Sequence, residues 1–190
     1  MADVRRVSRD IVWQPGDLAV DVHLRPTTAA DLDFVVAAER DADTAPYIVG
    51  WPRERHAAAL TDPDLCHRIV VRPDGVVGFI LLAGLTGPNR AIEFRRLVVA
   101  EKGRGYGRAS IRAVLRLAFD ELKAHRLWLD VKTHNARARR LYVSEGFVLE
   151  GVLRDCLARP DGDYDSLAVM SMLATEYREA ESGAGLDHGA

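Results

Sequence analysis

The sequence predicts a mixed α/β fold, in which a mixed central β-sheet is flanked by α-helices. Strand-like segments follow one another over residues 67–99. The last of them leads into a glycine-rich loop and an amphipathic helix over Gly107–Lys123, and the apolar segment Leu127–Val131 then indicates another strand. A strand–helix–strand unit makes its strands parallel through a right-handed crossover, whereas hairpins are antiparallel, so the predicted sheet contains both directions.

The first 60 residues predict a strand and two helices. Partial alternation of apolar and polar residues indicates a strand over Leu18–Pro26. The segment Thr27–Asp41 has a helical pattern, with threonines at its start as N-caps and acids in its first turn. A shorter helix is expected over Gly50–Leu60, where Pro52 lies in the first turn.

Three antiparallel strands are expected next. The tetrapeptide RPDG between two apolar runs is a tight-turn signal and predicts a hairpin over His67–Leu85. The segment Ala91–Val99 is the third strand, antiparallel to the second. In the helix that follows, an apolar stripe containing Ile111, Leu115 and Leu122 marks the face that packs on the sheet.

The rest of the pattern is a strand, a helix and two more strands. Leu127–Val131 is a short buried strand, and Asn135 is expected to cap the next helix, which ends at Gly146. Two strands over Phe147–Ala158 and Tyr164–Leu173, joined through RPDGD, complete the sheet.

We expect a single domain over residues 18–175, because a chain of 190 residues that is 48% hydrophobic can bury one core. Residues 1–17 are polar and predict an irregular N-terminal arm. Residues 176–190 end in ESGAGLDHGA, a composition typical of a disordered tail.

Composition also limits the classes of function. A net charge of -2 gives no reason to expect nucleic acid or a membrane as a partner. The longest apolar run, near VVGFILLAGL, is too short to span a bilayer, and the first residues contain no stretch typical of a signal peptide. Cys66 and Cys156 are far apart and form no metal-ligand spacing. We therefore expect a cytoplasmic protein without a metal.

The loop Lys102–Gly107, KGRGYG, is suited to holding an anion. Glycines allow the backbone to approach a ligand closely, and a helix N-terminus offers free N–H groups and a favourable dipole. The loop matches neither the P-loop nor the dinucleotide pattern G-x-G-x-x-G, and no Mg²⁺-binding Ser or Thr follows it, which argues against a nucleotide hydrolase. The alternative interpretation is a helix-start loop that binds no ligand.

Two stretches together resemble the GNAT N-acetyltransferase superfamily. KGRGYG resembles its acetyl-CoA pyrophosphate loop, Gln/Arg-x-x-Gly-x-Gly/Ala, with Lys102 in the first position. HNARARRLYVSEGF resembles its Asn…Ala-x-x-Leu-Tyr…Gly-Phe element, and the predicted order of strands and helices is that of the GNAT fold. The segment Gly146–Leu173 resembles the branch that contains the Rim-type ribosomal-protein alanine N-acetyltransferases and the spermidine acetyltransferases.

This resemblance implies acetyl-CoA as the cosubstrate, bound where the strands Ala91–Val99 and Leu127–Val131 separate. Backbone N–H groups of the glycine loop would hold the pyrophosphate. The end of the first strand would pair with the pantetheine arm, and one of its N–H groups would stabilise the oxyanion. The residues implied in cofactor binding are Arg96, Leu97, Val98, Val99, Lys102, Gly103, Arg104, Gly105, Tyr106, Gly107, Arg108 and Asn135.

The resemblance also implies catalytic residues. Tyr142 matches the tyrosine that protonates the departing CoA thiolate, and a phenol with a pKa of about 10 is protonated at neutral pH. The alternative is a buried aromatic ring with a satisfied hydroxyl. The acceptor amine needs a base, for which Glu93 and Asp130 are candidates, since some Rim-type relatives use a glutamate at the Asp130 position. Pairing with a cation is the alternative for Glu93, and a structural hydrogen bond is the alternative for Asp130.

The expected acceptor is a primary amine, on a small molecule or at a protein N-terminus, that attacks directly in a ternary complex. Tyr47 and Trp51 lie where GNAT proteins build the acceptor wall, although aromatic packing explains them equally well. Two other functions stay open: a non-catalytic CoA-binding sensor or assembly module, and an acyltransferase that uses a longer acyl-CoA. A homodimer paired through the C-terminal strands is also open.

Overall fold

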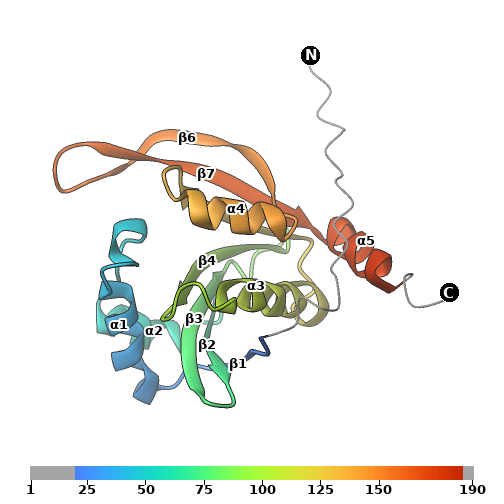
Figure 1. Cartoon of the computed structure of the whole chain (residues 1–190), viewed down its shortest axis with the longest axis horizontal. Helices are drawn as coiled ribbons and strands as arrows, with labels where there is room; N and C mark the ends of the chain where they lie inside the picture. The colour runs from blue at the N-terminus through green and yellow to red at the C-terminus, as the bar shows by residue number, and fades with distance from the viewer. Residues whose placement is uncertain (1–19, 186–190) are drawn as a thin grey trace.

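The computed structural model describes residues 20–185, in which seven strands form one sheet with helices on both of its faces (Figure 1). The strands are β1 (His23–Pro26), β2 (Leu65–Arg72), β3 (Gly75–Ala83), β4 (Ala91–Val99), β5 (Arg126–Lys132), β6 (Val148–Ala158) and β7 (Tyr164–Leu173). Their order across the sheet is β1-β2-β3-β4-β5-β7-β6. Only the neighbours β4 and β5 are parallel, and the other pairs are antiparallel.

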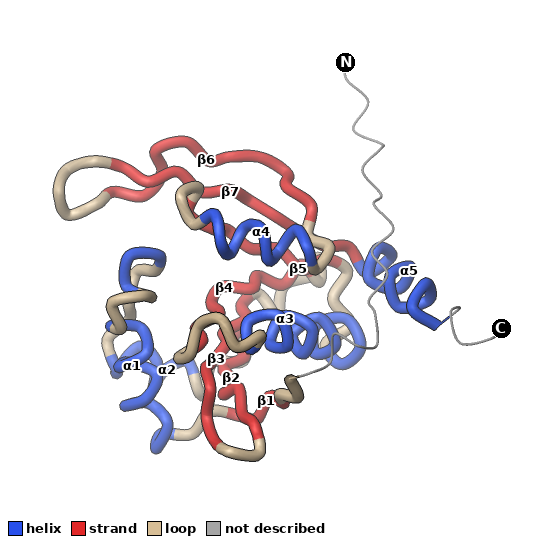
Figure 2. Tube along the Cα trace, viewed as in Figure 1, coloured by secondary structure: helices blue, strands red, loops and turns tan. Residues whose placement is uncertain are grey.

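Within residues 20–185, four α-helices and several short helical turns lie between the strands, and a fifth α-helix follows the last strand (Figure 2). The helices are α1 (Leu32–Arg40), α2 (Arg53–Ala59), α3 (Tyr106–Arg116), α4 (Ala136–Ser144) and α5 (Ala174–Gly185). The 3-10 turns are η2 (Ala29–Asp31) and η3 (Ala45–Tyr47), and a π-helical turn, η4 (Leu117–Glu121), continues α3.

The predicted mixed α/β fold is confirmed, including the hairpin of β2 and β3 and the parallel crossover through α3. The strand β4 has the predicted ends, Ala91 and Val99. At α4, the Asn135 side chain accepts a hydrogen bond from the backbone N–H of Ala138 at 3.1 Å, which confirms the predicted N-cap.

The C-terminal region differs from the expectation. A disordered tail is expected from residue 176, but α5 continues to Gly185. Tyr177 fixes this helix because its ring stacks on Phe119 at 5.0 Å and its hydroxyl donates to Asp120 Oδ2 at 2.7 Å. The expected arm over residues 1–17 and the end of the tail, residues 186–190, lie outside the described residues.

Alternating side chains of the strands build apolar cores on both faces of the sheet. Val70 and Ile80 belong to the larger core, together with the apolar stripe of α3. Their strand neighbours Ile69 and Phe79 belong to a second core with Val35 of α1. The period-2 alternation of the strands therefore separates α3 and α4 on one face from α1 on the other.

A β-bulge at Arg95 changes the direction of the side chains along β4. Leu82 of β3 pairs with Phe94, and its neighbour Leu81 pairs with Arg96, so Arg95 is the extra residue. Phe94 consequently lies in the α3 core, while Val98 packs with α1. A regular strand would place these two even-numbered residues on the same face.

The strands β4 and β5 separate immediately before this bulge. Their pairing covers only Ala91–Glu93 of β4 and Arg126–Trp128 of β5. Beyond Glu93, β4 has no strand partner on its β5 side within residues 20–185. The bulge and the lost pairing together open the sheet at the carboxyl ends of two parallel strands.

Candidate active site

The separation of β4 and β5 forms a cleft with a volume of about 540 Å³. Its walls come from the end of β4, the glycine loop, the end of β5 and α4. The segment between α1 and α2 and the β6–β7 hairpin supply the remaining wall. In Figure 1 the segment between the first two helices rises toward this hairpin, on the side where α3 and α4 begin.

The glycine loop lies at one end of the cleft. Gly103 and Gly105 have φ angles of +80° and +81°, which favour glycine, and Gly105 is the N-cap of α3. A Cβ atom on Gly105 would lie 3.3 Å from Val20 Cγ2, and one on Gly107 would lie 3.2 Å from Leu141 Cδ2. The loop is therefore a close-packed backbone cradle at a helix N-terminus, which fits a pyrophosphate.

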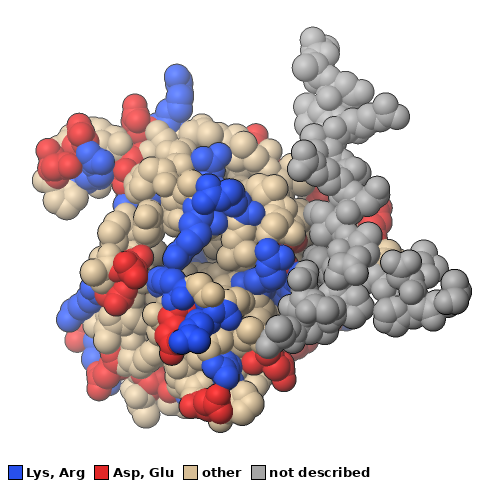
Figure 3. All heavy atoms as spheres, in the orientation of Figure 1, with Lys and Arg blue, Asp and Glu red and all other residues tan. Residues whose placement is uncertain are grey.

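Cations surround this end of the cleft. Lys102 donates to the carbonyl of Val99 and to Thr44 Oγ1, the latter at 3.0 Å, and burial, with the charge of Arg137, lowers the pKa of Lys102. Arg137 lines the cleft, as does Arg108, which pairs with buried Glu145 at 3.0 Å. Figure 3 shows Lys and Arg side chains gathered over the face on which α3 and α4 lie. An anionic ligand therefore meets a basic surface here.

Several implied cofactor residues line the cleft and two do not. The cleft-lining residues among them are Arg96, Leu97, Val98, Val99, Lys102, Gly103, Gly105, Gly107, Arg108 and Asn135. Arg104 lies outside the lining and faces Glu101 at 3.6 Å. Tyr106 is buried in the α3 core, where its hydroxyl bonds with Arg72, so its side chain serves packing.

Tyr142 lies on α4 and lines the cleft. Its ring packs edge-on against Phe94 at 6.3 Å and Phe147 at 5.5 Å. Burial, and to a smaller extent the negative charge of Asp130, raises the pKa of the Tyr142 phenol. The hydroxyl consequently remains protonated at neutral pH and is able to donate a proton.

The two candidate bases differ in their surroundings. Asp130 lines the cleft on β5, and burial together with the charge of Glu93 raises the pKa of Asp130, partly offset by Arg95. Glu93 lies outside the lining, and both of its carboxylate oxygens accept from Arg95 Nε at 3.1 Å. The structure thus leaves the Asp130 carboxylate facing the cleft and holds that of Glu93 in an ion pair.

The two aromatic residues expected in the acceptor wall are placed differently. Tyr47 lines the cleft, with its ring 5.7 Å from that of His134. Trp51 is buried outside the lining, between the guanidinium groups of Arg55 at 3.9 Å and Arg96 at 4.8 Å.

Lysines from both separated strands hold the segment between α1 and α2 over the cleft, a feature not predicted from the sequence. Lys102, after β4, binds Thr44 Oγ1, and Lys132, at the end of β5, donates to the carbonyl of Pro46 at 2.9 Å. These partners lie 58 and 86 residues apart in the chain, so no local pattern reveals them.

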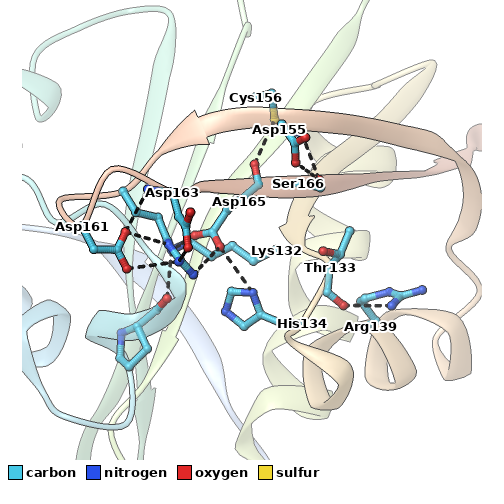
Figure 4. A network of polar contacts seen from close by, with 12 residues as sticks. Lys132, Thr133, His134, Arg139, Asp155, Cys156, Asp161, Asp163, Asp165 and Ser166 are labelled. Atoms are coloured by element: carbon cyan, nitrogen blue, oxygen red, sulfur yellow. Dashed lines mark hydrogen bonds and ion pairs between the residues drawn. The ribbon is translucent and has the colours of Figure 1, made fainter.

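Asp165 attaches the β6–β7 hairpin to the same place (Figure 4). This buried carboxylate lies 2.8 Å from Lys132 Nζ, 3.6 Å from His134 Nδ1 and 3.8 Å from Arg159 Nη1. The hydrogen bond and ion pairs lower the pKa of Asp165. Lys132 therefore joins the hairpin, the end of β5 and the segment above the cleft.

A buried chain of polar side chains lies on the α1 side of β4. Glu39 Oε1 lies 3.0 Å from Arg96 Nη1, and Glu39 Oε2 lies 3.3 Å from His56 Nε2. His56 Nδ1 is 3.1 Å from His67 Nε2, and His67 Nδ1 is 2.9 Å from Thr27 Oγ1. Arg96 also donates to the carbonyl of Val49 at 2.7 Å, which fixes part of the cleft wall from behind. No local pattern in the sequence predicts this chain, because its members come from several separate segments.

Comparison with known proteins identifies the family. A model of the acetyltransferase (GNAT) domain matches residues 21–148, more than half of the chain. The protein belongs to the GNAT acetyltransferase family. Uncharacterized N-acetyltransferases of Mycobacterium bovis and Mycobacterium tuberculosis are 36% identical to this GNAT protein over 100 residues, which are 51% of its chain. That match spans 62% of the length of those curated relatives.

Solved structures share the same GNAT fold. The spermidine N-acetyltransferase of Vibrio cholerae in complex with CoA and spermine superposes with a TM-score of 0.75 at 24% identity, covering 83% of this chain and 98% of that one. A chimera of the Vibrio cholerae enzyme and hSSAT gives a TM-score of 0.75 at 23% identity, covering 84% and 99%. The GNAT resemblance read from the two motifs is thereby confirmed, while membership of the Rim-type branch stays a prediction.

Over residues 20–185, no helix combines the length and apolar character needed to cross a membrane. Within the same range, no group of three or more His, Cys, Asp or Glu side chains is arranged to hold a metal ion.

Proposed function

We propose that this GNAT protein transfers the acetyl group of acetyl-CoA to a primary amine. One observation carries the proposal: a single cleft contains the N-terminus of α3 with its glycine cradle, the protonated hydroxyl of Tyr142 and the carboxylate of Asp130. An anion site, an acid and a base in one cleft are the parts that acyl transfer from a CoA thioester to an amine requires.

The glycine cradle fits the pyrophosphate of CoA. Side chains at Gly105 and Gly107 would fill the space beside Val20 and Leu141. Lys102 and Arg137 supply positive charge, and the α3 N-terminus supplies N–H donors. The β5-facing edge of β4 after Glu93 offers backbone groups to the pantetheine amides, in the manner of an added strand.

Asp130 and Tyr142 divide the proton transfers between them. An alkyl amine with a pKa of about 10 is almost fully protonated at pH 7, so a base is useful before it attacks the thioester carbonyl. Asp130 takes that proton, directly or through water. As the new C–N bond forms and the C–S bond breaks, Tyr142 gives its proton to the departing thiolate. We favour Asp130 over Glu93 because Arg95 already occupies both oxygens of Glu93.

The test is release of free CoA thiol from acetyl-CoA in the presence of an amine panel: N-terminal peptides, amino acids, spermidine, aralkylamines and aminoglycosides. We expect thiol release that depends on an acceptor. We also expect Gly105→Val to raise the KM for acetyl-CoA at least tenfold, because it adds a β-branched side chain at a φ of +81° beside Val20.

Two results would contradict the proposal. Saturable acetyl-CoA binding without thiol release from any amine would support a CoA-binding sensor. Faster turnover with a longer acyl-CoA than with acetyl-CoA would support a different acyltransferase.

A further inference from the structure

The wall of the cleft away from the glycine cradle is largely apolar. The segment between α1 and α2 contributes Tyr47, Ile48 and Val49, and the β6–β7 hairpin contributes Leu157 and Leu167. Val49 is 59% exposed and Tyr47 is 38% exposed, so both present apolar surface to whatever enters. Apolar groups that line a cleft bind apolar groups of a ligand.

The carboxylates around this wall, apart from Asp130, already have cationic partners. Arg95 holds Glu93 at both oxygens. Asp165 is buried and paired with Lys132, His134 and Arg159 (Figure 4).

Asp161 and Asp163, on the loop that follows β6, both pair with Arg159, at 3.1 Å and 2.7 Å. Two other carboxylates line the cleft at its far end, where Asp43 lies near Lys102 and Glu101 adjoins the glycine loop. Among residues 20–185, Asp130 is therefore the only carboxylate that lines the cleft at the apolar wall.

Cations outnumber acids along the whole cleft. The lining contains six Lys or Arg residues but only three Asp or Glu residues. A polyamine carries several positive charges a few ångströms apart, and each charge that enters an apolar or basic wall without a carboxylate loses solvation that nothing replaces. This cleft offers a place for one ammonium group, beside Asp130, and apolar surface next to it.

We propose that the acceptor is a monoamine with an apolar group close to the amine, and that polyamines are poor acceptors. The inference rests on the proposed acetyl transfer and names the acceptor of that same cleft. Two sources offer this chemistry: a small aralkylamine, and a peptide whose first residue is apolar. If the acceptor is such a monoamine, this protein uses a different acceptor from the spermidine acetyltransferases that share its fold.

The experiment compares kcat/KM for 2-phenylethylamine, a peptide amide that begins with Phe, and spermidine at one saturating acetyl-CoA concentration. We expect one of the two apolar amines to exceed spermidine at least tenfold, and the better of them identifies the source. A kcat/KM for spermidine equal to or above both would overturn the inference and leave the proposed acetyl transfer standing. Absence of thiol release with every amine would overturn both.

Variants at Val49 test the wall directly. Val49→Asp adds a carboxylate to the apolar wall without changing the backbone carbonyl that Arg96 binds. We expect the ratio of kcat/KM for the apolar amine to that for spermidine to fall at least tenfold, with the KM for acetyl-CoA unchanged. Val49→Asn separates polarity from charge and should shift the ratio less. Val76→Asp, a matched change at a 38% exposed valine outside the cleft, should leave the ratio unchanged. An unaltered ratio in Val49→Asp would contradict the proposed wall.

Discussion

Polar side chains on one side of β4 are buried and paired with one another, whereas those on the other side face an open cleft. On the α1 side, Glu39, Arg96, His56, His67 and Thr27 form a buried chain in which every side chain has a partner. In the cleft, no hydrogen bond or ion pair within residues 20–185 occupies the hydroxyl of Tyr142, the carboxylate of Asp130 or the guanidinium of Arg137. Buried polar groups with partners stabilise a fold, whereas groups left open in a cleft are available to a ligand.

The buried chain joins two histidines to a carboxylate at one end and a hydroxyl at the other. His56 Nε2 lies 3.3 Å from Glu39 Oε2, and His56 Nδ1 lies 3.1 Å from His67 Nε2. At the far end, His67 Nδ1 lies 2.9 Å from Thr27 Oγ1. These side chains occupy one another, whereas the cleft groups must change their protonation during a reaction.

The largest effect is expected from Glu39→Gln, which removes one charge from the buried chain. Burial alone would raise the pKa of Glu39, but hydrogen bonds from His56 and Trp51 and the charge of Arg96 outweigh it and lower the pKa. Removing one partner of a buried ion pair leaves the other uncompensated and costs about 3–5 kcal/mol. Urea unfolding should show this loss in the free energy of unfolding. Glu54→Gln, at an exposed position of α2, is the control, and equal stability of the two variants would contradict the role of the chain.

The next effect is a loss of stability in mild acid. Burial, then the charge of His56, lowers the pKa of His67 to about 4. In the unfolded chain the imidazole of His67 binds a proton near pH 6.5, whereas in the folded protein it binds one only near pH 4. The free energy of unfolding therefore decreases as the pH falls from about 6.5 to about 4. The contribution of His67 reaches about 3 kcal/mol.

Urea unfolding at a series of pH values between 7.5 and 5 measures the slope of the free energy of unfolding against pH. His67→Gln should reduce the slope, and His125→Gln, at an exposed histidine, should keep it. The same slope in wild type and His67→Gln would assign the acid sensitivity to other groups. Carboxylates with lowered pKa values, such as Asp31, titrate below this window and do not confuse the comparison.

A smaller effect is expected from Asp130→Asn on the cleft side. Loss of the base should lower kcat/KM for the amine about 100-fold at pH 7. The deficit should narrow toward pH 9–10, because more of the amine is then already neutral in solution. Asp155→Asn, on exposed β6, is the matched control. A deficit that stays constant with pH would show that Asp130 does not act as a base.

The smallest effect is expected from Lys102→Met. One charge-assisted contact to a phosphate contributes about 1–2 kcal/mol, so the KM for acetyl-CoA should rise about 5–20-fold while kcat changes little. Lys123→Met, on an exposed turn outside the cleft, should not change it. An unchanged KM in Lys102→Met would place the pyrophosphate away from this lysine.

The sequence predicted those features that depend on local pattern. A tight-turn signal between two apolar runs predicted the hairpin of β2 and β3, a glycine loop before an apolar stripe predicted α3, and Asn135 predicted the cap of α4, because each follows from residues close together in the chain. The cleft residues Tyr142 and Asp130 followed from a resemblance, and the structure places both in one cleft.

Features built from distant residues were not predicted. The contact of Lys132 with Pro46 and the chain from Glu39 to Thr27 join segments that only the sheet order brings together. The bulge at Arg95 was also not predicted, although the adjacent Arg95 and Arg96 interrupt the alternation of apolar and charged residues in this strand. Trp51 is a case in which the sequence suggested a site residue that the structure places elsewhere. It was expected at the acceptor wall, but its ring packs on Arg55 and Arg96 outside the cleft lining.

Acetyl transfer with Tyr142 as the proton donor is tested by comparing acceptor-dependent thiol release and thermal unfolding of Tyr142→Phe with those of wild type. Tyr164→Phe, at an exposed tyrosine of β7, is the control. We expect Tyr142→Phe to lose kcat about 10²–10⁴-fold, while its Tm and its KM for acetyl-CoA stay close to those of wild type. Turnover unchanged in Tyr142→Phe, or lost only in proportion to a fall in Tm, would contradict the role of Tyr142 as proton donor.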